Sequence, residues 1–235
     1  MKTHDELITY IFAQEKSSDL AREFEGWLSQ RRFKAFAEQY KDKIRRKYRL
    51  SENDASVKDL RFELETAALL LREAKFTLEY EKYAALKQRG PDFTVTFKTH
   101  TPFNVEVRRI RNAELDEGDA EAHIIKLMAV LCDKVGQMPP GAVNLLWMST
   151  ERPLPESDLI NATTELRQRA ERKVEEYFTR RGFKSAGDFI RQYQKLSGIV
   201  LRQEGGSIVW MNSLARHKAT NEMMTAIRKL IDMRI

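Results

Sequence analysis

The chain has 235 residues, of which 42% are hydrophobic and 32% are charged, and its net charge is +6. This balance fits one substantial globular core or two small ones, and no apolar run is long enough to span a membrane. The single cysteine, Cys132, excludes a disulfide framework within the chain and a cysteine-based zinc cluster. Because the first residues carry acids and form no apolar signal region, we expect a cytoplasmic protein without membrane contact.

The first fifty residues are predicted to be helical. Apolar side chains recur there at three- and four-residue steps, in three successive stretches. The polar segment 51–54 interrupts this pattern and marks the start of a new element. Ser56 or Asp59 is the expected cap of the next helix, which we place over Leu60–Lys75.

Strands and helices alternate in the middle of the chain. Alternating hydrophobic residues predict strands at 76–80, 93–97 and 103–110, the last two joined as a hairpin. A helix over about Glu117–Gln137 and a buried strand over Val143–Met148 follow. This order predicts an α/β core with a mixed central sheet flanked by helices, in which the first three strands form a meander.

The C-terminal third begins with helices and returns to strands. One long helical stretch is expected from Glu156 to Arg181, followed by a shorter helix near 186–196. Two strands, at 198–201 and 207–211, precede a closing helix from about Asn221 to Met233. We interpret the residues around 156–196 as a helical insertion in the sheet domain.

The positive charge is concentrated in the expected N-terminal region, residues 1–54, which we separate from a sheet domain at 55–235. Between Arg31 and Arg49 the chain carries a net +7, which leaves −1 for all the other residues. Such an excess favours a polyanionic partner, and the alternative is a solvated helical face. The candidate nucleic-acid-binding residues are Arg31, Arg32, Lys34, Arg45, Arg46 and Lys47.

Two carboxylates are expected to meet at one end of the hairpin. Asp92 stands at the entrance to one strand, and Glu106 lies within the strand that would pair with it. Adjacent carboxylates repel, so such a pair either shares a proton or binds a cation. Mg²⁺ or Mn²⁺ suits this pair because Mg²⁺ binds a few carboxylates and keeps waters for a substrate phosphate.

These segments resemble the PD-(D/E)xK superfamily of metal-dependent nucleases. The resemblance lies in Pro91-Asp92 and in Glu106-Val107-Arg108, with arginine where the family usually has lysine. It covers roughly Leu60 to Ser149, where the predicted order of helix, three strands, helix and strand is also that of the family. The resemblance implies a restriction-endonuclease-like core that hydrolyses phosphodiester bonds, with DNA favoured over RNA as substrate.

The family also tends to carry a glutamate on its first helix near a Phe-Glu-Leu sequence, and helical geometry favours Glu63 over Glu65 for this role. At 100° per residue Glu63 falls on the apolar side of the helix, whereas Glu65 falls on the polar side. A carboxylate facing the core needs a partner such as a metal, unless it reaches water at the core's edge. The resemblance thus implies a metal site of Asp92, Glu106, Glu63 and Val107.

The expected catalytic residues are Asp92, Glu106, Glu63 and Arg108, and the last departs from the family pattern. Arginine keeps the positive charge and grips phosphate with its planar fork, but its high pKa makes it a poor proton acceptor. Three functions stay open. The acids favour a Mg²⁺-dependent endonuclease, and Arg108 favours a non-catalytic nucleic-acid-binding protein of the same fold. The third is an assembly subunit whose basic helices bind an acidic partner; a homodimer is also open.

Overall fold

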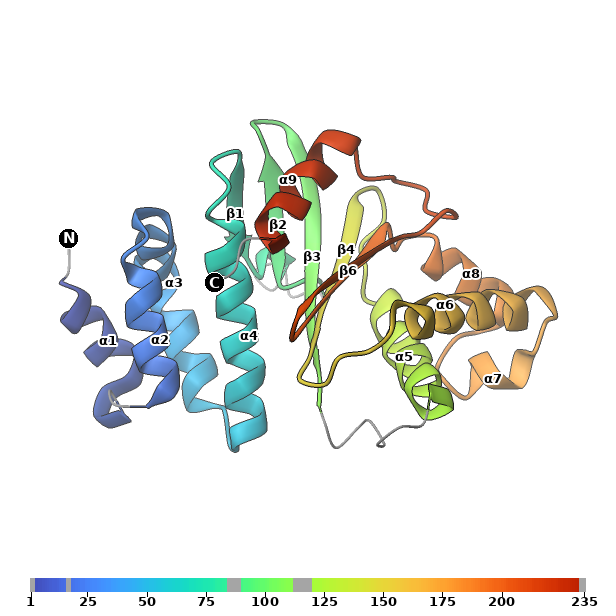
Figure 1. Cartoon of the computed structure of the whole chain (residues 1–235), viewed down its shortest axis with the longest axis horizontal. Coiled ribbons are helices and arrows are strands. Elements are labelled where there is room, and N and C mark those ends of the chain that lie inside the picture. Colours follow the sequence, from blue (N-terminus) through green and yellow to red (C-terminus); the bar gives the residue numbers. More distant parts are fainter. Residues whose placement is uncertain (1–2, 16–17, 84–89, 112–119, 233–235) are drawn as a thin grey trace.

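One six-stranded sheet runs through the molecule, and helices cover both of its faces (Figure 1). The computed structural model describes residues 3–15, 18–83, 90–111 and 120–232. The strands are β1 (Phe76–Tyr80), β2 (Phe93–Phe97), β3 (Thr101–Ile110), β4 (Val143–Thr150), β5 (Gly198–Gln203) and β6 (Gly206–Met211). The helices are α1 (His4–Phe12), the 3₁₀ turn η1 (Ala13–Glu15), α2 (Asp19–Leu28), α3 (Arg31–Arg49), α4 (Asp54–Leu70), α5 (Ala120–Val135), α6 (Glu156–Glu171), α7 (Glu175–Thr179), α8 (Ala186–Tyr193) and α9 (Asn221–Asp232).

The strands lie in the sheet in the order in which they occur in the chain. The first three form the predicted antiparallel meander, β3, β4 and β5 are parallel, and β6 returns antiparallel beside β5. The α/β class with a mixed sheet is therefore confirmed. Because β3, β4 and β5 run in one direction, their C-terminal ends meet at one edge of the sheet, where α/β proteins commonly bind ligands.

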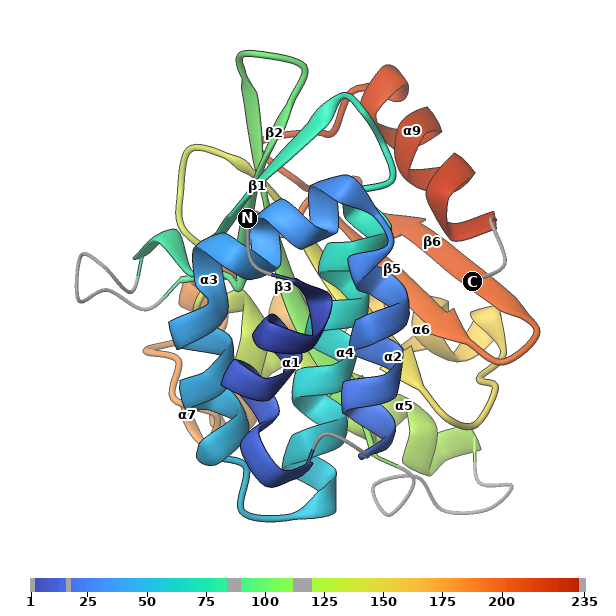
Figure 2. The same ribbon diagram turned by 90° about the vertical axis from the view of Figure 1, so that its left-hand side faces the viewer.

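Two hydrophobic cores lie on opposite faces of the sheet. Helices α1 to α4 and α9 pack on one face, and α5, α6 and α8 pack on the other. Figure 2 shows α1 to α4 in front of the sheet, and among these helices α4 packs directly against β3. The N-terminal helices share their buried side chains with α4 and the sheet, so they form part of the same core.

The helix boundaries differ from the expected ones at both ends of α4, which stops at Leu70 and not at Lys75, and within the stretch from Glu156 to Arg181. Helix α4 begins at Asp54 because Asn53 caps it: the Asn53 side chain accepts from the Ser56 N–H, and the Ser56 hydroxyl accepts from the Asn53 N–H. The stretch expected as one helix from Glu156 is broken between α6 and α7, where Lys173 adopts a φ of +55° that an α-helix does not allow.

The start expected for the helix at Glu117 and the last residue of the closing helix lie outside the described residues. Helices α6 to α8 fall between β4 and β5 in the chain, where the helical insertion was expected. Among the described helices, none combines the length and the apolar character needed to cross a membrane.

Candidate functional site

Asp92 and Glu106 lie at the same end of the sheet. Strand β2 pairs antiparallel with β3 so that Phe93 faces Val105, and one step further along this register Asp92 stands opposite Glu106. The N–H of Val107 donates a 2.8 Å hydrogen bond to Oδ2 of Asp92. The hairpin thus fixes the Asp92 carboxylate near the C-terminal end of β3, as its sequence position predicts.

A third acid, Glu81, contacts Asp92 from the end of β1. It follows β1 directly, and its N–H donates a 2.7 Å hydrogen bond to the carbonyl oxygen of Asp92. Its φ of +46° lies in the left-handed region, which costs a residue with a Cβ about 1–2 kcal/mol. Such strain persists only where surrounding contacts hold it, and it commonly accompanies functional sites.

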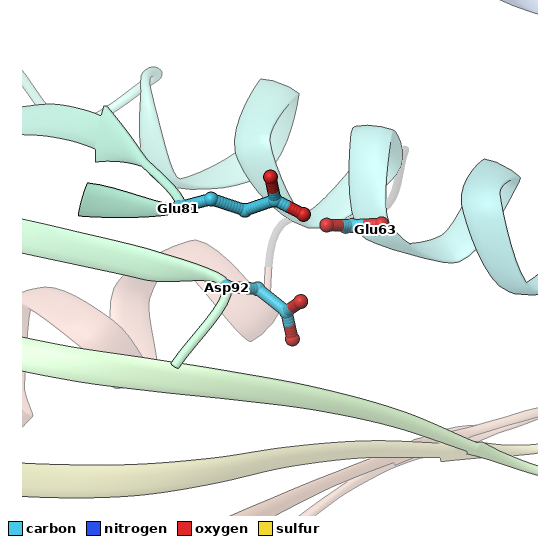
Figure 3. A group of neighbouring side chains, drawn as sticks. All are labelled: Glu63, Glu81 and Asp92. Carbon is cyan, nitrogen blue, oxygen red and sulfur yellow. The ribbon is translucent and has the colours of Figure 1, made fainter. Parts of the chain in front are cut away.

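Glu63, Glu81 and Asp92 form what we call the acidic cluster (Figure 3). Each offers one carboxylate oxygen, and these three oxygens lie within 4.8 Å of one another. Glu63 is buried, which confirms its prediction on the apolar side of α4, whereas Glu65 pairs with Arg202 at 2.8 Å. Hard oxygen donors this close together fit a small divalent cation such as Mg²⁺ or Mn²⁺.

The hydroxyl of Tyr80 is an unsatisfied polar group beside the cluster. It is buried, forms no hydrogen bond of ordinary geometry among the described residues, and interacts with the nearby Glu63 carboxylate. Burial, and then the negative charge of Glu63, raise the pKa of Tyr80 well above its usual value. Because a buried hydroxyl without a partner is costly, Tyr80 is a donor suited to a carboxylate or a bound water at this site.

Lysines from two helices compensate the acids. The Nζ atom of Lys47, on α3, lies 2.6 Å from a carboxylate oxygen of both Glu63 and Glu81. On the other face of the sheet, Nζ of Lys134, on α5, lies 2.7 Å from Oε1 of Glu106. Asp92 thus belongs to the acidic cluster, and Glu106, which stands opposite Asp92 in the register, is bound by Lys134.

The buried carboxyl groups hold protons more tightly than exposed ones. Burial and then the charge of Asp92 raise the pKa of Glu63 to about 8 and that of Glu106 to about 7. Burial also raises the pKa of Asp92. In Glu81 burial is the largest single effect and raises the pKa, but the hydrogen bonds and charges of Lys47 and Lys43 together outweigh it, so the pKa is lowered. Near neutral pH the site therefore favours either an extra proton or a bound cation.

A pocket of about 260 Å³ opens beside two of these groups, Glu63 and Asp92. Its charged lining residues are the acids Asp59, Glu63 and Asp92 and the cations Lys47, Arg108, Arg109 and Lys134. Glu106 and Arg108 lie two residues apart on β3 and so share one face of the strand. Arg109 points to the opposite face, toward α4, as its position in the strand predicts.

The basic helix α3 uses much of its charge inside the protein. Arg32 donates hydrogen bonds to carbonyl groups at the C-terminal end of α4 and at the start of β1. Arg45 stacks over the ring of Tyr10, with its guanidinium carbon 4.5 Å from the ring centre, and Lys47 binds the acidic cluster. The other predicted nucleic-acid-binding residues are the exposed Arg31 and Arg46 and the half-buried Lys34.

The sequence reasoning missed two members of the site, Glu81 and Lys134. Glu81 could have been found by extending the register of β1 and β2 by one pair beyond Tyr80, whereas no local pattern links Lys134 to Glu106. Comparisons with protein-family models, with curated proteins and with solved structures found no match. The chemistry of the site thus rests on its own residues.

Proposed function

We propose that the protein is a metal-dependent, endonuclease-like hydrolase of phosphodiester bonds, with DNA favoured over RNA by its resemblance to the PD-(D/E)xK superfamily. The observation that carries this proposal is the meeting of carboxylates and cations in one pocket at the C-terminal end of β3. Phosphodiester hydrolysis needs both, since carboxylates hold the metal and cations hold the phosphate. A module that only binds nucleic acid needs the cations alone.

Glu63, Glu81 and Asp92 would hold Mg²⁺ or Mn²⁺. When bound, such an ion lowers the pKa of a water and offsets the negative charge that develops on the phosphate. The N–H of Val107, which donates to Asp92, orients that carboxylate. This assignment replaces Glu106 in the expected ligand set by Glu81, and it gives Val107 a supporting role through its amide.

Glu106, Lys134 and Arg108 would act on the substrate from the α5 face of the sheet. With a pKa of about 7, the Glu106 carboxylate can accept a proton near neutral pH. Lys134 donates to Glu106 and lines the pocket, so it provides the lysine ammonium group that Arg108 does not have. Arg108 keeps the role of a phosphate clamp.

A second function is favoured by a specific observation. Lys47 and Lys134 already form ion pairs with Glu63, Glu81 and Glu106 at distances of 2.6 to 2.7 Å. Paired in this way, buried acids are tolerated without any metal. The same residues would then form a structural ion-pair network in a non-catalytic nucleic-acid-binding protein or assembly subunit.

A cleavage assay separates the two functions. Plasmid, single-stranded DNA and RNA are incubated with Mg²⁺, Mn²⁺ or EDTA, using wild type, Asp92→Asn and Asp158→Asn. Asp158 is a matched control because it is also a buried acid, but it lies on α6 and contacts His123. The proposal expects metal-dependent cleavage by wild type and Asp158→Asn, and none by Asp92→Asn. Cleavage by Asp92→Asn, or no cleavage by wild type with either metal, would overturn it.

A further inference from the structure

A second pocket lies beside the first, along the same edge of the sheet. It has a volume of about 380 Å³ and is bounded by α4 and by the ends of β4 and β5. Arg109 lines both pockets, so they are neighbours. We call this second pocket the edge groove; its charged lining residues are Lys58, Arg61, Glu65, Arg109, Glu151 and Arg202.

The edge groove carries a positive charge. Four of its charged lining residues are cationic and two are acidic, which gives it a net charge of +2. It also lies at the C-terminal edge of the parallel strands, directly beside the pocket that is lined by Glu63 and Asp92. A cationic hollow in this position fits a polyanionic ligand that extends beyond the first pocket.

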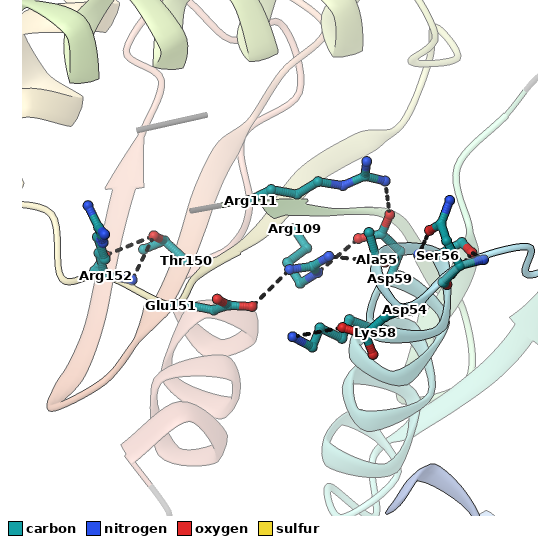
Figure 4. Close-up of polar contacts among 11 residues, drawn as sticks. Asp54, Ala55, Ser56, Lys58, Asp59, Arg109, Arg111, Thr150, Glu151 and Arg152 are labelled. Atoms are coloured by element: carbon teal, nitrogen blue, oxygen red, sulfur yellow. Dashed lines mark hydrogen bonds and ion pairs between the residues drawn. The ribbon is translucent and has the colours of Figure 1, made fainter. Parts of the chain in front are cut away.

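Arg109 is a fixed wall between the two pockets. Its guanidinium donates to Asp59, to Glu151 and to the carbonyl oxygen of Ala55, at 2.9 to 3.0 Å (Figure 4). Only 8% of the residue is exposed. Asp59 also binds Arg111 at 2.6 Å. Since these contacts join α4 to the ends of β3 and β4, Arg109 shapes the groove and is not available to exchange partners.

Lys58 and Arg61, in contrast to Arg109, can exchange their ion-pair partners. They lie three residues apart on the same side of α4, and their side chains are 45% and 48% exposed. Lys58 pairs with Asp54 and Arg61 pairs with Glu23, both at the surface. Exposed ion pairs of this kind stabilise a protein little, so replacing a carboxylate by a phosphate costs little.

We propose that the edge groove binds the backbone of the nucleic-acid strand next to the phosphate in the pocket lined by Glu63 and Asp92, with Lys58 and Arg61 as phosphate contacts. The nature of the ligand rests on the proposed function. The groove takes the place of α3 as the main binding surface, because α3 uses Arg32, Arg45 and Lys47 in contacts within the protein.

Binding of a fluorescein-labelled single-stranded DNA oligonucleotide tests this assignment. Fluorescence anisotropy is measured in EDTA over a series of salt concentrations, so no cleavage is involved. Lys58→Gln/Arg61→Gln should weaken binding about five- to tenfold and lower the salt slope by about 1.4, since each phosphate contact on a single strand contributes about 0.7. Arg180→Gln/Arg191→Gln removes the same charge from exposed ion pairs at the end of α7 and on α8 and should bind as wild type does.

Three outcomes would overturn the proposal that the edge groove binds nucleic acid. The first is unchanged affinity in Lys58→Gln/Arg61→Gln, and the second is absence of DNA binding by wild type. The third is a loss of DNA affinity in the α3 variant Arg31→Gln/Lys34→Gln/Arg46→Gln in place of the groove variant. Thermal denaturation verifies that each variant is folded. If the double variant unfolds, the single variant Arg61→Gln replaces it and should show about half of the change in salt slope. Binding through the groove without any cleavage would refute the proposed hydrolase and leave the groove intact.

Discussion

Replacing Glu63 by glutamine should stabilise the protein in the absence of metal. The buried carboxyl has a pKa of about 8, against 4.5 for an ordinary glutamate, because of burial and then the charge of Asp92. In the window between these values the folded state binds more protons than the unfolded state, so stability falls as the pH rises. Glutamine keeps the shape and a hydrogen-bond acceptor for Lys47 without carrying the charge.

The gain should grow with pH. One pKa unit corresponds to about 1.4 kcal/mol, so ionising Glu63 above its folded pKa costs about 5 kcal/mol relative to its protonated form. Part of this gain is lost in the variant, because glutamine binds Lys47 less strongly than the Glu63 carboxylate does. The contact of Lys47 with Glu81 remains. We expect a net stabilisation of about 2–3 kcal/mol near pH 8.5, and of less than about 1 kcal/mol near pH 5.5.

Urea denaturation in EDTA at both pH values measures this difference, and thermal denaturation with and without Mn²⁺ measures metal binding. At a metal concentration of about 100 times Kd, a bound ion stabilises the folded state by about 2.7 kcal/mol. Wild type should show this shift and Glu63→Gln should lose it. Asp158→Asn should instead lose stability, because Asp158 contacts His123, and should keep the metal shift. A Glu63→Gln variant that is less stable than wild type near pH 8.5, or that keeps the metal shift, would refute the reasoning.

Three further predictions concern single basic residues. Lys134→Met should cost about 3 kcal/mol in urea denaturation near pH 8.5 and less near pH 5.5, because it leaves Glu106 buried without its cation until that carboxyl is protonated; an equal loss at both pH values would contradict this. Arg108→Lys should preserve or raise metal-dependent plasmid cleavage, since a compact ammonium can also hold the phosphate; loss of cleavage would show that the planar fork is required. Arg32→Met should lower the unfolding free energy by about 2–3 kcal/mol while DNA affinity stays unchanged, because its hydrogen bonds are made to backbone carbonyls within the protein; weaker DNA binding would return Arg32 to the nucleic-acid interface.

Local patterns in the sequence determined the elements and half of the site. Alternation over residues 93–97 and 103–110 set the hairpin, and a hairpin has a register that places Asp92 near Glu106 whatever surrounds it. Helical periodicity likewise placed Glu63 on the apolar side of α4. These features follow from residues close together in the chain, so one sequence is enough to predict them.

The tertiary structure alone decided which charges meet. The excess of +7 between Arg31 and Arg49 can be counted in the sequence, but the groups that neutralise it are distant in the chain: Lys47 meets Glu63 and Glu81 only because α3 packs beside α4. Glu106 meets Lys134 in the same way across β3 and α5. Periodicity tells which face of a helix a side chain occupies, but not what that face will contact. The acidic cluster, the ion pairs of Lys47 and Lys134 and the edge groove can therefore be seen only in the packed structure.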